Sequence, residues 1–249
     1  MRPLLAYDEV FLSPHLDDAA LSCGGQIAQA SRRGAKVLVI TLFTADAPDG
    51  ELSPLAAELH QLWAAGPNPF AERRREDQQS CAILGADCEH WNFADAIYRR
   101  DAEGAWLYPD ERALLAPPRA ADAGLIDELA RRFSAFSGMQ VRGPLAIGGH
   151  VDHRLVREAL EKAALPGCEF YEDFPYARSR KKRWQAMGLE LGWSKRRIAL
   201  EPEDLEQKIA AIAAFPSQLG AVFTDAAMLR HEVEKFTRAR GGELLYSRR

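Results

Sequence analysis

Hydrophobic runs alternate with amphipathic stretches along the chain, a pattern typical of an α/β protein. Residues 9–13 form a short apolar run that ends in a Pro-His turn, and we predict a first strand there. Apolar side chains recur at helical spacing over 18–33 ahead of Gly34, which predicts a helix with a glycine stop. Residues 36–43 are rich in Val, Ile and Leu, as in a strand covered on both faces. Together they form the β-α-β unit that builds parallel sheets.

The same pattern continues through the rest of the chain. Further helices are predicted over 70–84, 121–136 and 152–164, and further strands over 90–93, 143–149 and 168–172. Beyond 172 the chain is predicted to be mainly helical, with an edge strand at 243–246. Residues 44–69, with a helix over 54–65, and 95–119 are predicted to be long loops of the kind that form lids or binding loops. The expected fold is a Rossmann-like three-layer α/β/α domain with a mostly parallel sheet, spanning 1–249 without a linker.

Composition narrows the class of protein. A chain of 249 residues, 47% of them hydrophobic, buries enough surface to fold without a disulfide or a metal. Its net charge of -4 argues against general nucleic-acid binding, which favours basic domains. Basic runs at 73–75, 178–183 and 195–197 are interpreted as solvated helix faces, with contact to an anionic substrate as the alternative for the second run.

Membrane insertion and export are not expected from this sequence. The longest near-apolar stretch, 37–43, is far shorter than the roughly 18–20 residues of a membrane helix. The N-terminus lacks the long apolar core of a signal peptide, so we predict a cytoplasmic protein. Four cysteines without CxxC spacing are then expected to be free thiols.

Residues of the types that bind metals and transfer protons are concentrated in two short segments. Residues 13–18 read Ser-Pro-His-Leu-Asp-Asp, and residues 148–153 read Gly-Gly-His-Val-Asp-His. Each follows a predicted strand and precedes a predicted helix. Ligands of open parallel sheets bind beyond the carboxyl ends of strands, where the strand order reverses. If the two strands are adjacent, the two segments face each other across that crevice.

Together the segments supply three histidines and three aspartates, which are good zinc ligands. A catalytic zinc takes about three protein ligands and leaves the other groups free for proton transfer and oxyanion stabilisation. This combination of histidines and aspartates is consistent with the metal-assisted hydrolysis of an amide. The alternative is structural: Asp17 caps a helix, Asp18 favours its dipole, and the paired histidines are coincidental. Two such segments at strand-to-helix turns favour the metal site. His60, His90 and His231 are interpreted as surface or structural residues.

The paired segments resemble the signatures of the LmbE-like, or PIG-L, family of zinc-dependent de-N-acetylases, approximately [AS]-H-P-D-D-E and H-x-D-H. The stretches Arg73 to Glu76 and Leu84-Gly85 are similar to the family's Arg-x-x-Glu…Leu-Gly helix. The resemblance implies zinc, or another divalent ion, held by His15, Asp18 and His153. It also implies Asp17 as general base and His150 as oxyanion stabiliser or proton donor to the amine. Asp152 would orient a histidine, and Arg73 and Asp95 would contact the substrate. The structural alternative for Arg73 is that it belongs to a solvated basic turn, and for Asp95 that it caps a loop.

Leu16 and Ala19 depart from the family signature, which has proline and glutamate there. Neither change removes a metal ligand, so they bear on substrate contacts. The implied substrate is a small N-acetylated amino sugar or its conjugate, and this variant of the motif resembles deacetylases of antibiotic precursors. The alternative functions are those of an amidase of thiol conjugates, of a family member that catalyses a hydration, or of a module that binds a metal or a sugar without turnover. A nucleotide-binding Rossmann protein is disfavoured because no GxGxxG follows the first strand. The loop aromatics are expected to form a minor core under the loops, with one or two stacking on substrate.

Overall fold

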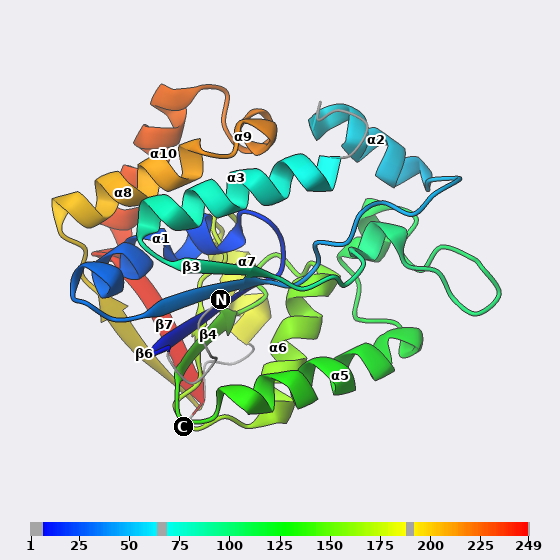
Figure 1. Cartoon of the computed structure of the whole chain (residues 1–249), viewed down its shortest axis with the longest axis horizontal. Helices are drawn as coiled ribbons and strands as arrows, with labels where there is room; N and C mark the ends of the chain where they lie inside the picture. The colour runs from blue at the N-terminus through cyan, green and yellow to red at the C-terminus, as the bar shows by residue number, and fades with distance from the viewer. Residues whose placement is uncertain (1–6, 64–68, 188–191, 249) are drawn as a thin grey trace.

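The computed structural model, which describes residues 7–63, 69–187 and 192–248, contains one seven-stranded sheet (Figure 1). Its strand order is β3-β2-β1-β4-β5-β7-β6. The pairings among β3, β2, β1, β4 and β5 are parallel, and the pairings of β7 with β5 and with β6 are antiparallel. The strands are β1 (Glu9–Ser13), β2 (Val37–Thr41), β3 (Asp87–His90), β4 (Gln140–Pro144), β5 (Glu169–Tyr171), β6 (Trp193–Ile198) and β7 (Glu243–Arg248). The α/β fold with a mostly parallel sheet is confirmed.

Helices cover both faces of this sheet. On one face α1, α3 and α8 pack together, and on the other α5 packs against α6 (Figure 1). The helices are α1 (Asp18–Arg32), α2 (Pro54–Trp63), α3 (Pro69–Leu84), α4 (Glu111–Leu114), α5 (Ala123–Phe133), α6 (Val151–Ala163), α7 (Arg180–Met187), α8 (Pro202–Ala213), α9 (Pro216–Val222) and α10 (Ala226–Arg240). In the described part of the chain, no helix is both long and apolar enough to span a membrane.

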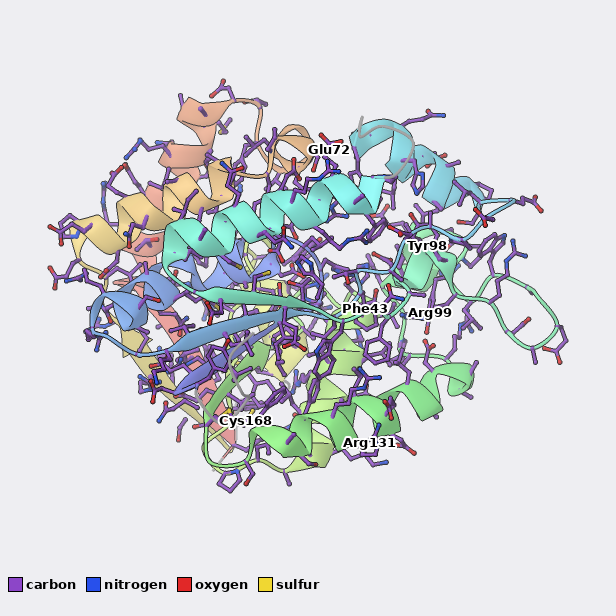
Figure 2. The ribbon with its side chains drawn as sticks, in the orientation of Figure 1. Phe43, Glu72, Tyr98, Arg99, Arg131 and Cys168 are labelled. Carbon is purple, nitrogen blue, oxygen red and sulfur yellow. The ribbon has the colours of Figure 1, made fainter. Side chains whose placement is uncertain are left out.

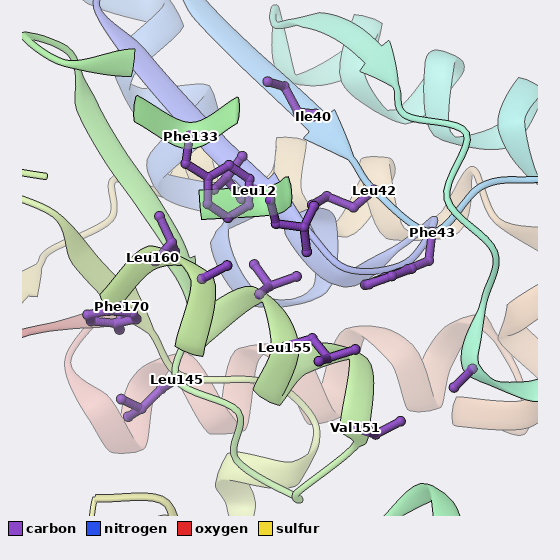
Figure 3. Close-up of a cluster of buried hydrophobic side chains, with 14 of the residues drawn as sticks. Leu12, Ile40, Leu42, Phe43, Phe133, Leu145, Val151, Leu155, Leu160 and Phe170 are labelled. Carbon is purple, nitrogen blue, oxygen red and sulfur yellow. The ribbon is translucent and has the colours of Figure 1, made fainter. Parts of the chain in front are cut away.

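Two hydrophobic cores lie on opposite faces of the sheet because successive strand residues point to opposite sides. Val10 and Leu12 of β1 belong to one core, and Phe11 between them belongs to the other. Figure 3 shows the first core, in which Leu12 and Leu155 of α6 lie between sheet and helix. This alternation produces the expected three layers.

The antiparallel edge of the sheet corrects two predictions. The basic run at 195–197 lies in strand β6, not on a helix face, and β7 lies between β5 and β6, not at the edge. An edge strand has little apolar periodicity to reveal it, and its charged side chains discourage pairing with other chains.

Pairing with neighbouring strands also moved two strand boundaries. The strand predicted at 143–149 is β4, which begins at Gln140 opposite Glu9 and ends at Pro144. The strand predicted at 90–93 is β3, which ends at His90. The predicted helix over 121–136 begins at Ala123 and ends in a short 3-10 turn. The final two residues of the helix predicted over 54–65 lie outside the described residues.

Candidate active site

The two segments singled out in the sequence meet at one point of the fold. Strand β1 pairs with β2 on one side and with β4 on the other, so the order of strands reverses there. His15 follows β1, and His150 and His153 lie at the start of α6. The ring centroid of His15 lies 4.8 Å from that of His150 and 5.4 Å from that of His153. The adjacency expected of the two strands is therefore present.

Paired glycines explain how the second segment reaches this position. Gly148 and Gly149 have φ angles of 103° and 84°, which side chains with a Cβ rarely adopt. They turn the chain sharply after β4, so that His150 becomes the residue preceding α6. There its Nδ1 accepts the backbone N–H of Asp152 at 3.2 Å. The ring of His150 is held by the start of the helix that it caps.

The Asp18 carboxylate joins the other two predicted metal ligands. Its Oδ2 lies 3.3 Å from His15 Nδ1 and 3.2 Å from His153 Nε2. Tetrahedral zinc with ligand bonds of about 2.0–2.1 Å has ligand–ligand separations of roughly 3.3 Å. The two distances from the Asp18 oxygen to the imidazole nitrogens of His15 and His153 therefore match two edges of such a tetrahedron.

Two further carboxylates fix which nitrogen of each ligand histidine faces that point. Asp152 Oδ2 lies 3.0 Å from His15 Nε2, and Asp173 Oδ1 lies 2.7 Å from His153 Nδ1. In each ring the opposite nitrogen is left to face Asp18. A carboxylate on the far nitrogen is the usual means of orienting a metal-bound histidine. The predicted orienting role for Asp152 agrees with this geometry. Asp173 was not singled out, although its position two residues after the end of β5, the neighbour of β4, is a signal that could have found it.

Asp152 is itself held by a buried cation that the sequence did not reveal. Arg99 Nη2 lies 2.7 Å from Asp152 Oδ1, and Arg99 Nε lies 3.2 Å from Asp122 Oδ1. The backbone N–H of Ala96 donates to Asp152 Oδ2 at 3.0 Å. Figure 2 shows Arg99 beside Phe43, whose ring centroid lies 5.4 Å from the guanidinium carbon. A single arginine within a long loop carries no motif, so only the fold identifies it.

Asp17 lies between His15 and α1 in an unusual backbone conformation, with φ of 157° and ψ of -25°. Burial and the nearby Asp18 charge raise the pKa of Asp17 to about 7, with the Arg73 guanidinium acting in the opposite direction. Asp17 also borders a small apolar hollow formed with residues of α8 and α9. A partly buried carboxyl group next to the ligand set is suitably placed for proton transfer.

The histidines differ sharply in their electrostatics. Burial lowers the pKa of His150 to about 3, and the neighbouring His15 adds to the effect, so His150 is neutral. Although burial alone would lower it, the pKa of His153 is raised to about 10, chiefly by Asp18 and Asp173. Despite its burial, His15 likewise has its pKa raised well above its ordinary value by Asp95, Asp152 and Asp18. The two rings that flank Asp18 are therefore in a strongly negative environment.

Carboxylates outnumber arginines in this cluster. The acids are Asp17, Asp18, Asp95, Asp152 and Asp173, and the arginines beside them are Arg73 and Arg99. This excess of negative charge favours a compensating positive charge and raises the pKa values of His15 and His153. A divalent cation placed among these donors would supply that charge and leave both rings neutral, the form in which imidazole binds metals. The cluster is therefore compatible with a divalent metal.

Both predicted substrate-contacting residues lie near this cluster. Arg73 is 4% exposed, so the alternative of a solvated basic turn is wrong for it. Its guanidinium lies 4.6 Å from the Trp63 ring centroid, and its Nε has no hydrogen-bond partner among the described residues. Asp95 Oδ2 lies 3.6 Å from His15 Nε2, while Asp95 Oδ1 accepts the backbone N–H of Ile97. Asp95 thus caps a 3-10 turn and also contributes charge to the site.

A larger pocket of about 630 Å³ adjoins the loop that precedes His150. Gly148, Gly149, Arg154 and Lys182 contribute to its lining. Tyr176 packs against Gly148 and is 37% exposed. By contrast, Trp63, Tyr98 and Tyr108 are buried, as the expectation of a minor core under the loops requires.

The family model for PIG-L, described as GlcNAc-PI de-N-acetylase, matches residues 10–164, which is more than half of the chain. The chain belongs to the PIG-L family. This confirms the family resemblance drawn from the two segments, and with it the expectation of a de-N-acetylase-type enzyme. The matched range of this PIG-L protein includes His15, Asp17, Asp18 and the His150–His153 segment.

Similar proteins agree with this membership. A 2'-N-acetylparomamine deacetylase of Streptomyces fradiae is 38% identical over 178 residues, which are 69% of this chain and 58% of that protein's length. A protein of the same description from Niallia circulans is 29% identical over 248 residues, covering 88% of this chain and 83% of its own. The structure titled the zinc inhibited form of teicoplanin deacetylase Orf2 has a TM-score of 0.84 and 29% identity, covering 97% and 98% of the two chains.

Proposed function

We propose that this PIG-L protein hydrolyses the N-acetyl group of an amino sugar or an amino-sugar conjugate, with a zinc ion as its metal. The observation that carries the proposal is the convergence of His15, Asp18 and His153, with Asp17 and His150 beside them. A pure binding module would need a metal-ligand set but not this additional acid and neutral imidazole. Similarity to deacetylases of acetylated paromamine and of teicoplanin supports the same reaction.

In this proposal His15 Nδ1, Asp18 Oδ2 and His153 Nε2 hold the ion. Once bound, zinc would polarise the acyl oxygen and lower the pKa of water. Two imidazoles and one carboxylate form a common donor set for catalytic zinc. Asp152 and Asp173 keep the two rings in the tautomers that this binding requires.

Asp17 accepts the proton of the attacking water in the proposed reaction. As the C–N bond breaks, that proton passes to the departing nitrogen, so the products are acetate and a free amine. Asp17 suits this task because it is partly buried beside Asp18 without being drawn into the contacts that join Asp18 to His15 and His153.

His150 donates a hydrogen bond to the acyl oxygen as negative charge develops on it. Its Nδ1 accepts the Asp152 backbone N–H, so a neutral ring carries its proton on Nε2. A neutral donor fixed before the reaction stabilises an oxyanion without reorganising. The contact with the start of α6 therefore sets both the tautomer and the direction of His150.

Arg73 and Asp95 are proposed to contact the sugar. Arg73 Nε, which has no hydrogen-bond partner among the described residues, is a donor for a sugar hydroxyl, and a buried donor gains from such a partner. The exposed Tyr176 ring beside Gly148 offers a face for the sugar or its conjugate.

We further propose one domain over 1–249, since strands from Glu9 to Arg248 share one sheet, and we retain the predicted cytoplasmic location.

The proposal is tested by incubating the zinc-loaded protein with a panel of N-acetylated compounds. The panel contains 2'-N-acetylparomamine, simple N-acetyl amino sugars, an N-acetyl glycopeptide antibiotic precursor and an N-acetyl thiol conjugate. Equimolar acetate and free amine from at least one amino sugar, absent with Asp17→Asn, is the expected result. Turnover of the thiol conjugate alone would identify an amidase of a different substrate class and refute the amino-sugar assignment.

A further inference from the structure

Four potential metal ligands lie between α3 and β3, outside the cluster around His15. Asp77 and Cys81 are one turn apart on α3 and share a face of the helix. Cys88 and His90 are two residues apart on β3 and share a face of the strand. The chain turns at Gly85, with φ of 72°, and brings the two faces together. In the sequence alone His90 and the cysteines had no such association.

The ligand atoms of Asp77, Cys81 and Cys88 lie close enough together to surround one ion, and His90 contacts both Asp77 and Cys88. Cys88 Sγ lies 3.4 Å from His90 Nε2 and 3.7 Å from Asp77 Oδ2, and His90 Nε2 lies 2.9 Å from Asp77 Oδ2. The ligand atoms of Asp77, Cys81 and Cys88 all lie within 4.8 Å of one another. Bonds of about 2.3 Å to sulfur and 2.0–2.1 Å to nitrogen or oxygen give tetrahedral edges of roughly 3.3–3.8 Å.

The surroundings favour a metal over four unrelated side chains. Thr41 Oγ1 donates a hydrogen bond to Asp77 Oδ2 at 2.8 Å and so orients the carboxylate from outside the group. Asp77 and Cys81 are buried, whereas Cys88 and His90 are partly exposed and give an ion access from solvent.

We propose that Asp77, Cys81, Cys88 and His90 bind a second zinc ion. Structural zinc typically has a closed set of four ligands, and thiolate, imidazole and carboxylate groups all bind zinc. The ligands proposed at the catalytic site include no sulfur, so the two sites differ in chemistry. This inference does not depend on the proposed reaction, because it rests on a separate group of side chains.

The site would tie α3 to the sheet. Asp77 and Cys81 come from the helix, Cys88 and His90 come from β3, and Thr41 ends the neighbouring strand β2. Arg73 lies one turn before Asp77 on α3 and reaches the Leu16 carbonyl in the candidate active site. Because an ion that binds only the folded chain raises its stability, loading this site should raise the melting temperature.

Cobalt distinguishes the two sites because thiolate ligands give Co²⁺ an intense near-ultraviolet charge-transfer band, which a site of nitrogen and oxygen ligands lacks. The full chain, kept reduced and stripped of metal, is titrated with Co²⁺ and, separately, with Zn²⁺ before elemental analysis. The variants are Cys81→Ser/Cys88→Ser, the partly exposed single change Cys88→Ser, and His15→Ala/His153→Ala. Cys168→Ser is the matched control for loss of a thiol, because Cys168 lies away from the group at the start of β5.

We expect two zinc ions per wild-type chain and one in each site-specific variant. The thiolate–cobalt band should persist in His15→Ala/His153→Ala and Cys168→Ser, and should be lost or greatly weakened in both variants of Cys88. Zinc should raise the melting temperature of His15→Ala/His153→Ala and should not do so when Cys81→Ser/Cys88→Ser is added to it.

One zinc per wild-type chain without a thiolate band, or a band that survives Cys81→Ser/Cys88→Ser in folded protein, overturns the proposal. Circular dichroism establishes that each variant is folded, and if the double cysteine variant does not fold, Cys88→Ser decides the outcome.

Discussion

The carboxylate of Asp152 lies 3.0 Å from Nε2 of His15, although 137 residues separate them in the chain. The contact is possible because β1 and β4 are neighbours, and it leaves Nδ1 of His15 facing Asp18. Arg99 holds the other oxygen of Asp152 at 2.7 Å. A chain of ionic contacts from Arg99 through Asp152 to His15 thus sets the orientation of one predicted metal ligand.

Asp152→Asn should weaken metal binding without removing a ligand. Loss of an outer carboxylate of this kind typically lowers metal affinity about 10–100-fold. The amide keeps the size of the side chain but no longer favours the required tautomer of His15. Competition with a calibrated chelator measures the affinity. Asp122→Asn is the matched control, because Asp122 pairs with the same Arg99 at 3.2 Å. Equal affinities for Asp152→Asn and the wild type would contradict the orienting role.

Substitution of the two α6 histidines should separate catalysis from metal binding. His150→Ala should retain the metal and lose about 10²–10³-fold in turnover, the usual effect of removing an oxyanion donor. His153→Ala should instead lose the metal, since its Nε2 faces Asp18 at 3.2 Å. Elemental analysis and acetate release measure the two effects. His231→Ala, an exposed position on α10, should change neither. Full activity of His150→Ala on its true substrate would refute its assignment.

Chelation of metal should abolish activity and leave the chain folded. The apolar side chains of both sheet faces are buried without help from the candidate metal ligands. A chain of this size normally folds on such cores alone. Far-ultraviolet circular dichroism should retain the signal of an α/β protein, and addition of zinc should restore turnover. Unfolding on chelation at room temperature would show that the fold depends on its metals.

Gly143→Ala should destabilise the fold at the contact between β4 and α6. A Cβ at Gly143 would lie 2.2 Å from Leu160 Cδ1, whose side chain is 1% exposed. Overpacking of this kind typically costs about 1–3 kcal/mol. Gly124→Ala in α5 is the control, because its Cβ would meet no atom within 4 Å. Urea denaturation compares the free energies of unfolding, and equal values for Gly143→Ala and the wild type would contradict the close approach.

The sequence by itself determined the parallel half of the sheet and the principal chemistry. Buried parallel strands such as β2 are continuous apolar runs, and the helices that follow have regular periodicity, so local pattern suffices to find both. His15 and His153 could be singled out as candidates because each lies in a short segment between a strand and a helix, where ligands of such sheets bind.

Only the tertiary structure decided the rest. Strand β6 is held by pairing with β7 rather than by an apolar pattern, so its Trp-Ser-Lys-Arg-Arg-Ile sequence does not predict it. Arg99 and Asp173 join the candidate active site because the fold brings them beside Asp152 and His153, and no local spacing records that arrangement. The group from Asp77 to His90 also forms only when the turn at Gly85 places a helix face against a strand face. Local sequence encodes periodicity and turns, whereas contacts between distant side chains depend on the pairing of strands and the packing of layers.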